Sequence, residues 1–376
     1  MTTRELARLA GVSSATVSLA LRNHPRISTA TKARISRLVR KHNYVVDGRV
    51  TELMRSIRRH AGDGPTSSLG LISLYPEERP WANRERPGHL ARLHRSMVKR
   101  AGELGYRVEE FWVRDPAMNP ARLAMIIETR GIRGLLSLGA PELEDEIPEE
   151  LQRFVIVTQG ASIRTKLHRV GSHFAHNATL LLEQLKARGY RRPGAVLQRF
   201  QDGRNAHVVA AMYLYFSKYV FDDLEIPILY AEDSVDLAVL VAWHRTHRPD
   251  VLIYADHGKH YASLQAFFRA QKISIPRDLG LAVLDAAVHP PGISGVRQGV
   301  EQMGFSAVDL LVSRLQQGES GLPRVAKIEK VEGDWVESGT LRAVIDPPVL
   351  VPVSGGEGNL VERGAGFLTP RGTDDA

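Results

Sequence analysis

The chain contains no cysteine among its 376 residues, which excludes disulfide frameworks, thiolate metal sites and cysteine nucleophiles. Its first residues, MTTRELARLAGV, carry charges where a secretory signal needs an apolar core. No apolar run approaches the ~20 residues that span a bilayer. We therefore expect a protein that acts in the cytoplasm and has no contact with a membrane.

Signatures of catalysis are also missing. The sequence has no P-loop, no G-x-S-x-G and no H-E-x-x-H pattern, and the strand-like stretch 69–75 precedes no glycine-rich turn. The 14 histidines cluster only loosely, near 168–176 and 257–260, without acidic partners at ligand spacing. An enzyme with an α/β fold stays an alternative, but we expect no catalytic residue, no metal site and no cofactor.

Positive charge is concentrated at the beginning of the chain. Residues 1–62 hold 13 Lys and Arg against 3 Asp and Glu, a net charge of +10. Because the whole chain carries +8, the remaining 314 residues carry −2. A small basic segment on a nearly neutral body is typical of a nucleic-acid-binding protein, although a solvated basic surface would give the same count.

The basic segment has the pattern of three short helices. Residues 3–10 place apolar side chains at helical spacing, Gly11 permits a tight turn, and Ser13 is a natural N-cap for a second helix. A third helix follows Ser28 and ends near Asn43. Helix, glycine-containing turn and second helix predict a helix-turn-helix, whose second helix enters the major groove. A plain three-helix bundle is the alternative.

Residues 3–44 resemble the DNA-binding head of the lactose/galactose repressor family. The likeness extends over many positions at fixed spacing: Leu6, Ala7, Ala10, Gly11, Val12, Ser13, Ala15, Thr16, Val17, Ser18, Leu21, Ile27, Ser28, Thr31, Ile35 and Tyr44. One departure concerns specificity, because Leu19 stands where many members carry an arginine. Apolar and hydroxyl contacts, or the shape of the DNA, would then read the half-site.

The resemblance also implies a hinge helix after the head. By register from Tyr44, Leu53 is the residue that wedges into the minor groove at the operator centre. Val46 and Val50 depart from the family, which commonly has proline and alanine there. An apolar patch in a linker is the alternative for Leu53. The predicted DNA contacts are Thr3, Ser13, Ser14, Ala15, Thr16, Ser18, Leu19, Asn23, Arg26, Ser28, Tyr44, Val50 and Leu53.

Strand and helix patterns alternate after the polar linker 60–66. Strands are predicted at 69–75, 106–113, 134–139 and 154–160, and the last of these is expected to close a first lobe. A second set of strands follows at 193–198, 226–231, 250–256 and 279–285. Helices are predicted between them at 87–104, 119–130, 176–188, 204–218, 235–246 and 260–271. Such alternation predicts two lobes with parallel sheets.

The later part of the chain is similar to the periplasmic-binding-protein-type sensor domain of the same family. The matching residues are Pro276, Asp278, Asp285, Val296, Gln298, Met303, Gly304, Ala307, Leu310, Leu311, Gly318, Ser338, Thr340 and Arg342. The sequence thus predicts an all-α helix-turn-helix head (1–45), a hinge helix and linker (46–66), a two-lobed α/β effector-binding and dimerisation domain (67–343) and a Pro- and Gly-rich tail (344–376).

The resemblance implies a homodimer that binds double-stranded operator DNA and a small-molecule effector, such as a carbohydrate. Arg204 fits the position of a family arginine at a helix start, and Asp285 fits a residue that faces the cleft. Tyr254 and Trp335 offer apolar faces to a sugar ring. His173 and Asp256 stand at or beside positions where the family has acidic or amide ligands.

Four of these effector residues have a structural alternative: a surface ion pair for Arg204, a helix cap or turn acceptor for Asp285, and core packing for Tyr254 and Trp335. A ligand-binding protein without DNA, like the secreted sugar receptors of this fold, is the alternative for the whole chain. The missing signal and the basic head count against it.

Overall fold

The computed structural model describes residues 3–21, 27–42, 67–83, 88–221, 225–232, 235–255 and 261–345. The head contains α1 (Thr3–Ala10), α2 (Ser14–Leu21) and α3 (Thr29–Lys41). Gly11 takes a positive φ of 62° in the turn between α1 and α2, a conformation that glycine adopts without strain. The Ser13 hydroxyl accepts a hydrogen bond from the Thr16 amide at 3.1 Å. The expected helix-turn-helix and its N-cap are therefore confirmed.

A small apolar core holds the three head helices together. Its fully buried members come from all three helices: Leu6, Ala7, Ala10, Val17, Ala20 and Ile35. At the start of α3, the Ser28 hydroxyl accepts from the Thr31 amide at 3.3 Å, which repeats the cap of α2. The head thus depends on few contacts, all within about forty residues.

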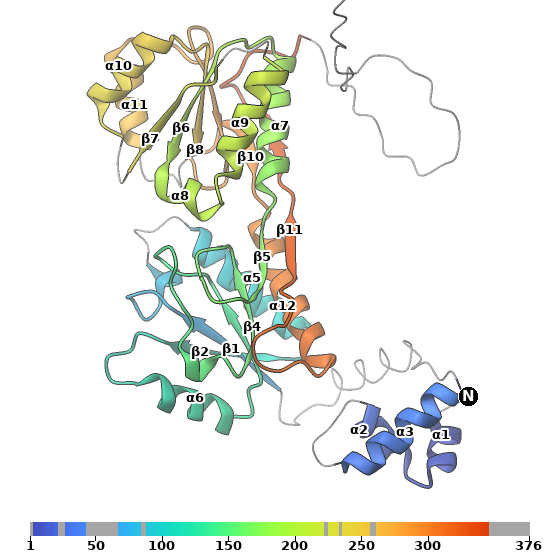
Figure 1. Cartoon of the computed structure of the whole chain (residues 1–376). Coiled ribbons are helices and arrows are strands. Elements are labelled where there is room, and N and C mark those ends of the chain that lie inside the picture. Colours follow the sequence, from blue (N-terminus) through green and yellow to red (C-terminus); the bar gives the residue numbers. More distant parts are fainter. Residues whose placement is uncertain are drawn as a thin grey trace, which may run out of the picture.

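The rest of the described chain forms two lobes, one above the other in Figure 1. Lobe 1 has a parallel sheet in the order β11-β5-β4-β3-β1-β2. Its strands are β1 (Ser68–Ser73), β2 (Arg107–Trp112), β3 (Gly134–Ser137), β4 (Val155–Gln159), β5 (His168–Ser172) and β11 (Ile328–Val331). Its helices are α5 (His89–Glu103), α6 (Pro120–Thr129) and α12 (Val300–Gln316), with short 3₁₀ turns at Pro80–Ala82 and Glu149–Leu151.

Lobe 2 repeats this design with the order β12-β10-β9-β8-β6-β7, in which only β12 is antiparallel. The strands are β6 (Pro193–Gln198), β7 (Ile228–Ala231), β8 (Val251–Ala255), β9 (Gly280–Val283), β10 (Ser294–Arg297) and β12 (Asp334–Val336). The helices are α7 (Phe174–Ala187), α8 (Arg199–Arg204), α9 (Val208–Tyr219), α10 (Leu237–His247) and α11 (Tyr261–Ala270). The predicted fold class is confirmed.

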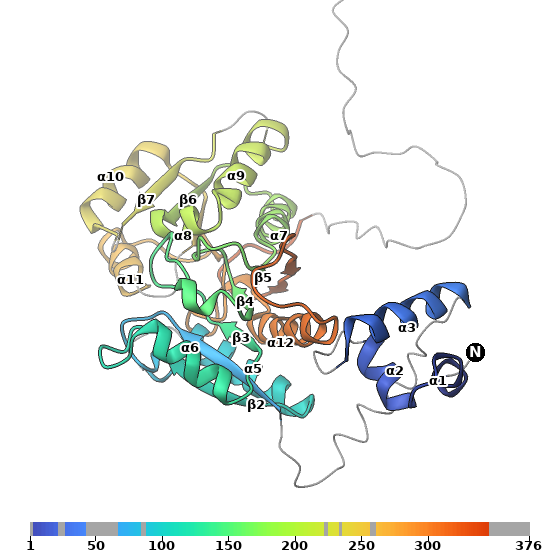
Figure 2. The same ribbon diagram turned by 60° about the horizontal axis from the view of Figure 1, so that its bottom comes forward.

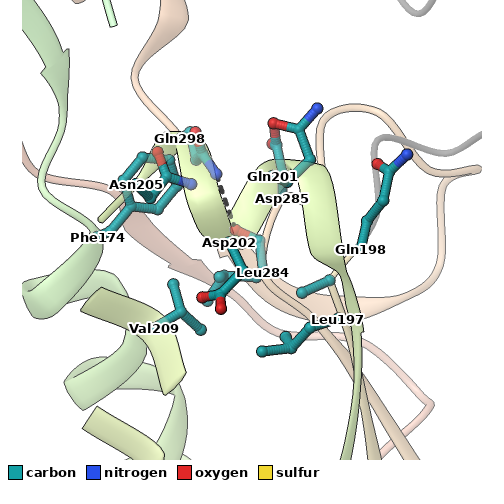
Figure 3. Close-up of a pocket in the computed structure, with 11 residues that line it drawn as sticks. Phe174, Leu197, Gln198, Gln201, Asp202, Asn205, Val209, Leu284, Asp285 and Gln298 are labelled. Atoms are coloured by element: carbon teal, nitrogen blue, oxygen red, sulfur yellow. Dashed lines mark hydrogen bonds between the residues drawn. The ribbon is translucent and has the colours of Figure 1, made fainter. Parts of the chain in front are cut away.

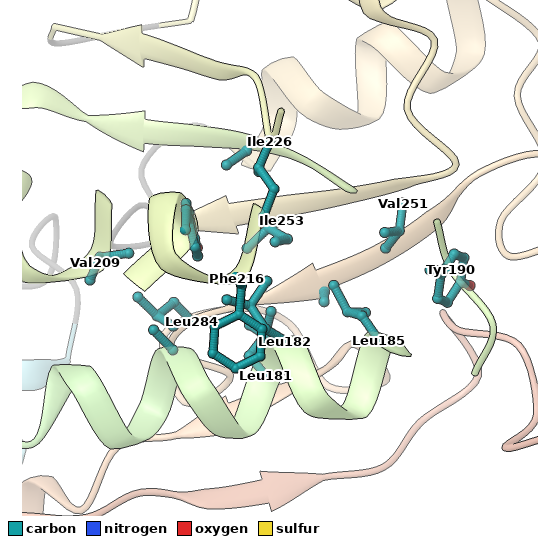
Figure 4. Close-up of a cluster of buried hydrophobic side chains, with 14 of the residues drawn as sticks. Leu181, Leu182, Leu185, Tyr190, Val209, Phe216, Ile226, Val251, Ile253 and Leu284 are labelled. Atoms are coloured by element: carbon teal, nitrogen blue, oxygen red, sulfur yellow. The ribbon is translucent and has the colours of Figure 1, made fainter. Parts of the chain in front are cut away.

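Alternation along each strand sends side chains to two separate apolar cores, one on each face of a sheet. In β8, Ile253 packs with α7 and α9, whereas Leu252 and Tyr254 pack with α10 and α11. Figure 4 shows the first of these cores, with Leu181, Leu182 and Leu185 of α7 facing the sheet. Figure 2 shows α7 and α9 on one side of lobe 2 and α10 and α11 on the other.

The chain crosses between the lobes at 172–174, 297–300 and 331–334. Asn177, fully buried in α7, ties two of these crossings together. Its amide donates to Ser172 Oγ at 2.9 Å, and its carbonyl oxygen accepts from the Gly333 amide at 2.9 Å. The His173 amide donates to the Val331 carbonyl at 2.7 Å. These bonds join the crossing segments side by side in one hinge.

Two expectations from the sequence were wrong. The strand at 154–160 does not close lobe 1, because β5 and the much later β11 extend the same sheet. The helix expected at 204–218 is two helices, α8 and α9, separated by residues 205–207. Ala206 and His207 there have positive φ values of 52° and 59°, which end α8 and turn the chain into α9.

Gly304 sits where α12 crosses α5 of lobe 1. A Cβ at this position would clash with Ser96 Oγ and lie 3.1 Å from the Leu93 carbonyl oxygen, so the Ser96 side chain or the helices would have to shift. We expect Gly304→Ala to lower the free energy of unfolding by about 1–3 kcal/mol through overpacking. Denaturant unfolding measures this.

Gly102→Ala in α5 is the matched control, because nothing lies within 4 Å of its Cβ position. Here alanine should stabilise the helix by ~0.5–1 kcal/mol. Equal effects of the two substitutions would contradict close packing of α5 on α12.

Within the described ranges, no helix combines the length and the apolar composition that a membrane crossing requires.

Candidate nucleic-acid interface and ligand pocket

The N-terminal end of α2 lies on the surface of the head. Val17 and Ala20 are buried against α1 and α3, whereas Ser14, Thr16 and Leu19 remain partly exposed. Ser13 is exposed, and its hydroxyl lies 2.9 Å from Thr16 Oγ1 in addition to capping the helix. The surface of α2 therefore offers hydroxyl groups and one leucine side chain to a partner, as its sequence predicts.

The other predicted DNA contacts are placed only in part. Thr3 begins α1, Ala15 and Ser18 belong to α2, and Ser28 caps α3. Five further positions lie outside the described residues: Asn23, Arg26, Tyr44, Val50 and Leu53. The exposed side chains of α3 include several of the basic residues, namely Arg34, Arg37 and Lys41.

A pocket opens at the carboxyl edge of the lobe 2 sheet (Figure 3). It begins where β6 and β8 end, with Leu197, Gln198 and Ala255 in its wall. In lobe 2, β7 lies on one side of β6 and β8 lies on the other, so the strand order reverses between β6 and β8. Ligands of open α/β sheets bind at such a reversal.

The remaining pocket wall comes from helices and from the ends of neighbouring strands. Its polar members are Gln201, Asp202, Asn205, Asp285 and Gln298, and its apolar members are Phe174, Val209 and Leu284. Gln298 is held in place because its amide donates to the Leu284 carbonyl at 3.3 Å. A mixed wall of amides, carboxylates and apolar groups can bind a small polar organic molecule.

Asp285 lines this pocket, as its sequence position predicts. Only 3% of the residue is exposed. One carboxylate oxygen, Oδ1, accepts from the Ala287 amide at 3.1 Å, and within the described residues Oδ2 has no hydrogen-bond partner. Burial raises the pKa of this carboxyl to about 6, because the charged form is poorly solvated.

Arg204 belongs to the cleft but does not line the pocket. It is the last residue of α8, not the first residue of a helix as predicted. Its guanidinium donates to Ser162 Oγ of lobe 1 at 3.4 Å and lies 5.5 Å from the centre of the Phe200 ring. Burial lowers the pKa of the guanidinium. Arg204 thus connects the facing edges of the two lobes.

His89, at the start of α5, faces the same region from lobe 1. Burial lowers its pKa to about 4, and the positive charges of Arg204 and Arg92 act in the same direction. Arg92 in turn donates to both carboxylate oxygens of Glu301, at 2.8 and 3.0 Å. The imidazole is therefore neutral at pH 7. The sequence alone does not indicate that His89 is a neutral histidine beside Arg204 and Arg92.

The other predicted effector residues are more distant from the pocket. Tyr254 has no exposed surface and packs in the core with α10 and α11, so it is a core residue and not a pocket residue. The Arg188 guanidinium lies 5.3 Å from the centre of the Trp335 ring. The indole N–H of Trp335 donates to the Glu337 carboxylate at 2.8 Å. His173 caps α7 by accepting from the His176 amide at 3.1 Å. Asp256 lies outside the described residues.

Sequence reasoning missed most of the pocket wall. Gln198 was the best available signal, since it ends a predicted strand and strand ends form such sites. Asp202 and Asn205 could not be found, because the short helix α8 and the break that follows it are absent from the periodicity of the sequence.

Comparison with known proteins identifies two domains. Residues 2–47 match the model of the bacterial regulatory proteins of the lacI family. The chain therefore carries a DNA-binding domain of the lacI type at its N-terminus. Residues 182–333 match the model of the periplasmic binding protein-like domain. No curated protein sequence matches the chain significantly.

Solved structures share the fold of this chain. The transcriptional regulator CelR in complex with cellobiose superimposes with a TM-score of 0.56 at 17% identity, over 90% of this chain and 99% of CelR. The lac repressor dimer bound to operator and the anti-inducer ONPF gives 0.53 at 16% identity, over 91% and 99%. A periplasmic binding protein/LacI transcriptional regulator from Alkaliphilus metalliredigens, complexed with D-xylulofuranose, gives 0.53 at 13% identity, over 74% and 100%.

Proposed function

We propose that this protein is a sequence-specific DNA-binding transcriptional regulator, acting as a repressor in the cytoplasm. The head carries the proposal: α2 presents its N-terminal half on the surface of a helix-turn-helix within a segment of net charge +10. Two protomers would pair and place one α2 in each half-site of a nearly palindromic operator. The lac repressor structure named above, a dimer on operator, supports this arrangement.

The base contacts of this proposal come from the predicted residues of α2. Ser14, Ala15 and Leu19 would contact base edges and thymine methyl groups, and Thr16 and Ser18 would contact phosphates. Tyr44, Val50 and Leu53 follow as contacts of the hinge segment, with Leu53 in the minor groove. Thr3, Asn23, Arg26 and Ser28 complete the phosphate contacts.

The pocket of lobe 2 provides the regulatory half of the proposal. A small molecule bound there, in the class of the cellobiose that CelR holds, would contact lobe 2 directly, and Arg204 at the end of α8 connects this lobe to Ser162 of lobe 1. Closing the lobes turns the hinge at Asn177, and the domain starting at residue 67 then changes the spacing of the two heads. Such coupling is typically worth about 1–3 kcal/mol.

Selection of bound duplexes from random DNA tests the proposal. We expect a pseudo-palindrome with two half-sites, each one contacted by one head. Because arginine and lysine displace counterions, affinity should fall by ~10³-fold or more between about 50 and 200 mM salt if six or more phosphates are neutralised. A chain that begins at residue 67 is the control and should bind no duplex. Failure of the full chain to prefer any sequence would refute the proposal.

A further inference from the structure

The chemistry of the pocket goes beyond a general effector site, and it rests on the proposed function. We propose that the small molecule carries an ammonium group, which Asp202 and Asp285 bind beside the ring of Phe174. These three side chains come from α8, from the end of β9 and from the start of α7, and all three line the same pocket.

The pocket wall carries negative charge that no cation of the wall balances. Its two ionisable members are Asp202 and Asp285, and neither lysine nor arginine is among its lining residues in the described part of the chain. The other polar members are side-chain amides, which are neutral. A cationic ligand would therefore be favoured by the charge of this wall.

In each carboxylate, one oxygen is hydrogen-bonded and the other is buried without a partner within the described residues. Asp202 is 4% exposed, and its Oδ2 accepts from His207 Nδ1 at 2.8 Å and from the Tyr230 hydroxyl at 3.0 Å. Within the described residues, Asp202 Oδ1 and Asp285 Oδ2 have no hydrogen-bond partner. Buried carboxylate oxygens are normally paired in folded proteins, so these two are suited to donors that arrive with a ligand.

The nearby arginines do not supply those donors. Arg92, the arginine that acts on Asp285, is held by both oxygens of Glu301. Arg204 points away to Ser162 of lobe 1. An ammonium group would supply charge and N–H donors together, and charge-assisted hydrogen bonds are roughly twice as strong as neutral ones. A hydroxyl group would supply the donors alone.

Two further features fit an organic cation. The Phe174 ring lines the pocket. The negative face of an aromatic ring attracts an ammonium group. No group of three or more His, Asp or Glu residues suited to a metal ion occurs in the described part of the chain, which argues against an inorganic ion here.

The test uses three probes that differ at one position: glucosamine, glucose and N-acetylglucosamine. Thermal unfolding and calorimetric titration of the full-length chain give the affinity for each probe. We expect glucosamine to bind at least tenfold more tightly than the other two, which corresponds to one charge-assisted contact. Asp202→Asn and Asp285→Asn should each remove that preference, whereas Glu232→Gln, an exposed carboxylate paired with Arg199 outside the pocket, should keep it.

Equal binding of glucose and glucosamine, no binding of glucosamine, or an unchanged preference in Asp202→Asn would each overturn the ammonium proposal. Operator binding of the same preparation separates this outcome from failure of the proposed function. A chain that binds its selected operator but shows no preference for the amine refutes the ligand class alone. A chain that binds no operator refutes the regulator, and the three probes still decide the chemistry of the pocket.

Discussion

Leu6→Ala is expected to unfold the head and lower operator affinity by roughly 100-fold. Leu6 is fully buried in a core of six residues, so its truncation should cost about 3 kcal/mol, which is about 100-fold in the ratio of folded to unfolded head. A head of this size has little stability to lose. Gel-shift titration on the selected operator measures the effect.

Leu9→Ala is the control for this prediction. Leu9 lies on the same helix, but half of its surface, 51%, is exposed, so its truncation should change stability by less than ~0.5 kcal/mol. The thermal transition of residues 67–345 should stay unchanged in both variants. Equal loss of operator affinity in both would mean that α1 itself contacts DNA and that the core has no special role.

Asp285→Asn should change the dependence of stability on pH. Burial raises the pKa of Asp285 from 3.8 to about 6. Its contribution to stability is therefore fully present below pH ~4 and is lost as pH rises to about 6. At one pKa unit per 1.36 kcal/mol, the loss amounts to about 3 kcal/mol. Relative to the wild type, the asparagine variant should become progressively more stable between pH 4 and 7.

His89 acts in the opposite direction over nearly the same range. Its pKa is lowered from 6.5 to about 4, so its contribution is present above pH ~6.5 and is lost as pH falls to about 4. His89→Gln should thus be more stable than the wild type at pH 4, relative to its stability at pH 7.

Urea unfolding at several pH values checks both predictions. The opposed contributions of Asp285 and His89 partly cancel in the wild type. Asp285→Asn should therefore make the free energy of unfolding rise with pH, and His89→Gln should make it fall. In the double variant neither contribution remains, so the profile should again be flat. A wild-type profile that neither substitution changes would show that both groups keep their ordinary pKa values.

The sequence by itself determined the head. Its contacts join residues close in the chain: the caps pair Ser13 with Thr16 and Ser28 with Thr31, and the apolar spacing follows the period of a helix. It also determined the alternation of strands and helices, and with it the two lobes and parallel sheets. The family resemblance added Asp285, a residue that the structure does place in the pocket.

Only the tertiary structure decided how the lobes are completed and which side chains form the pocket. β11 joins β5 with Ile328 opposite Arg169, a pairing that no local period encodes. The separate helix α8, which ends before Ala206 and His207, brings Asp202 and Asn205 to the pocket, and core packing removes Tyr254 from the cleft. Local propensities act over a few residues, whereas these features arise from packing between segments far apart in the chain.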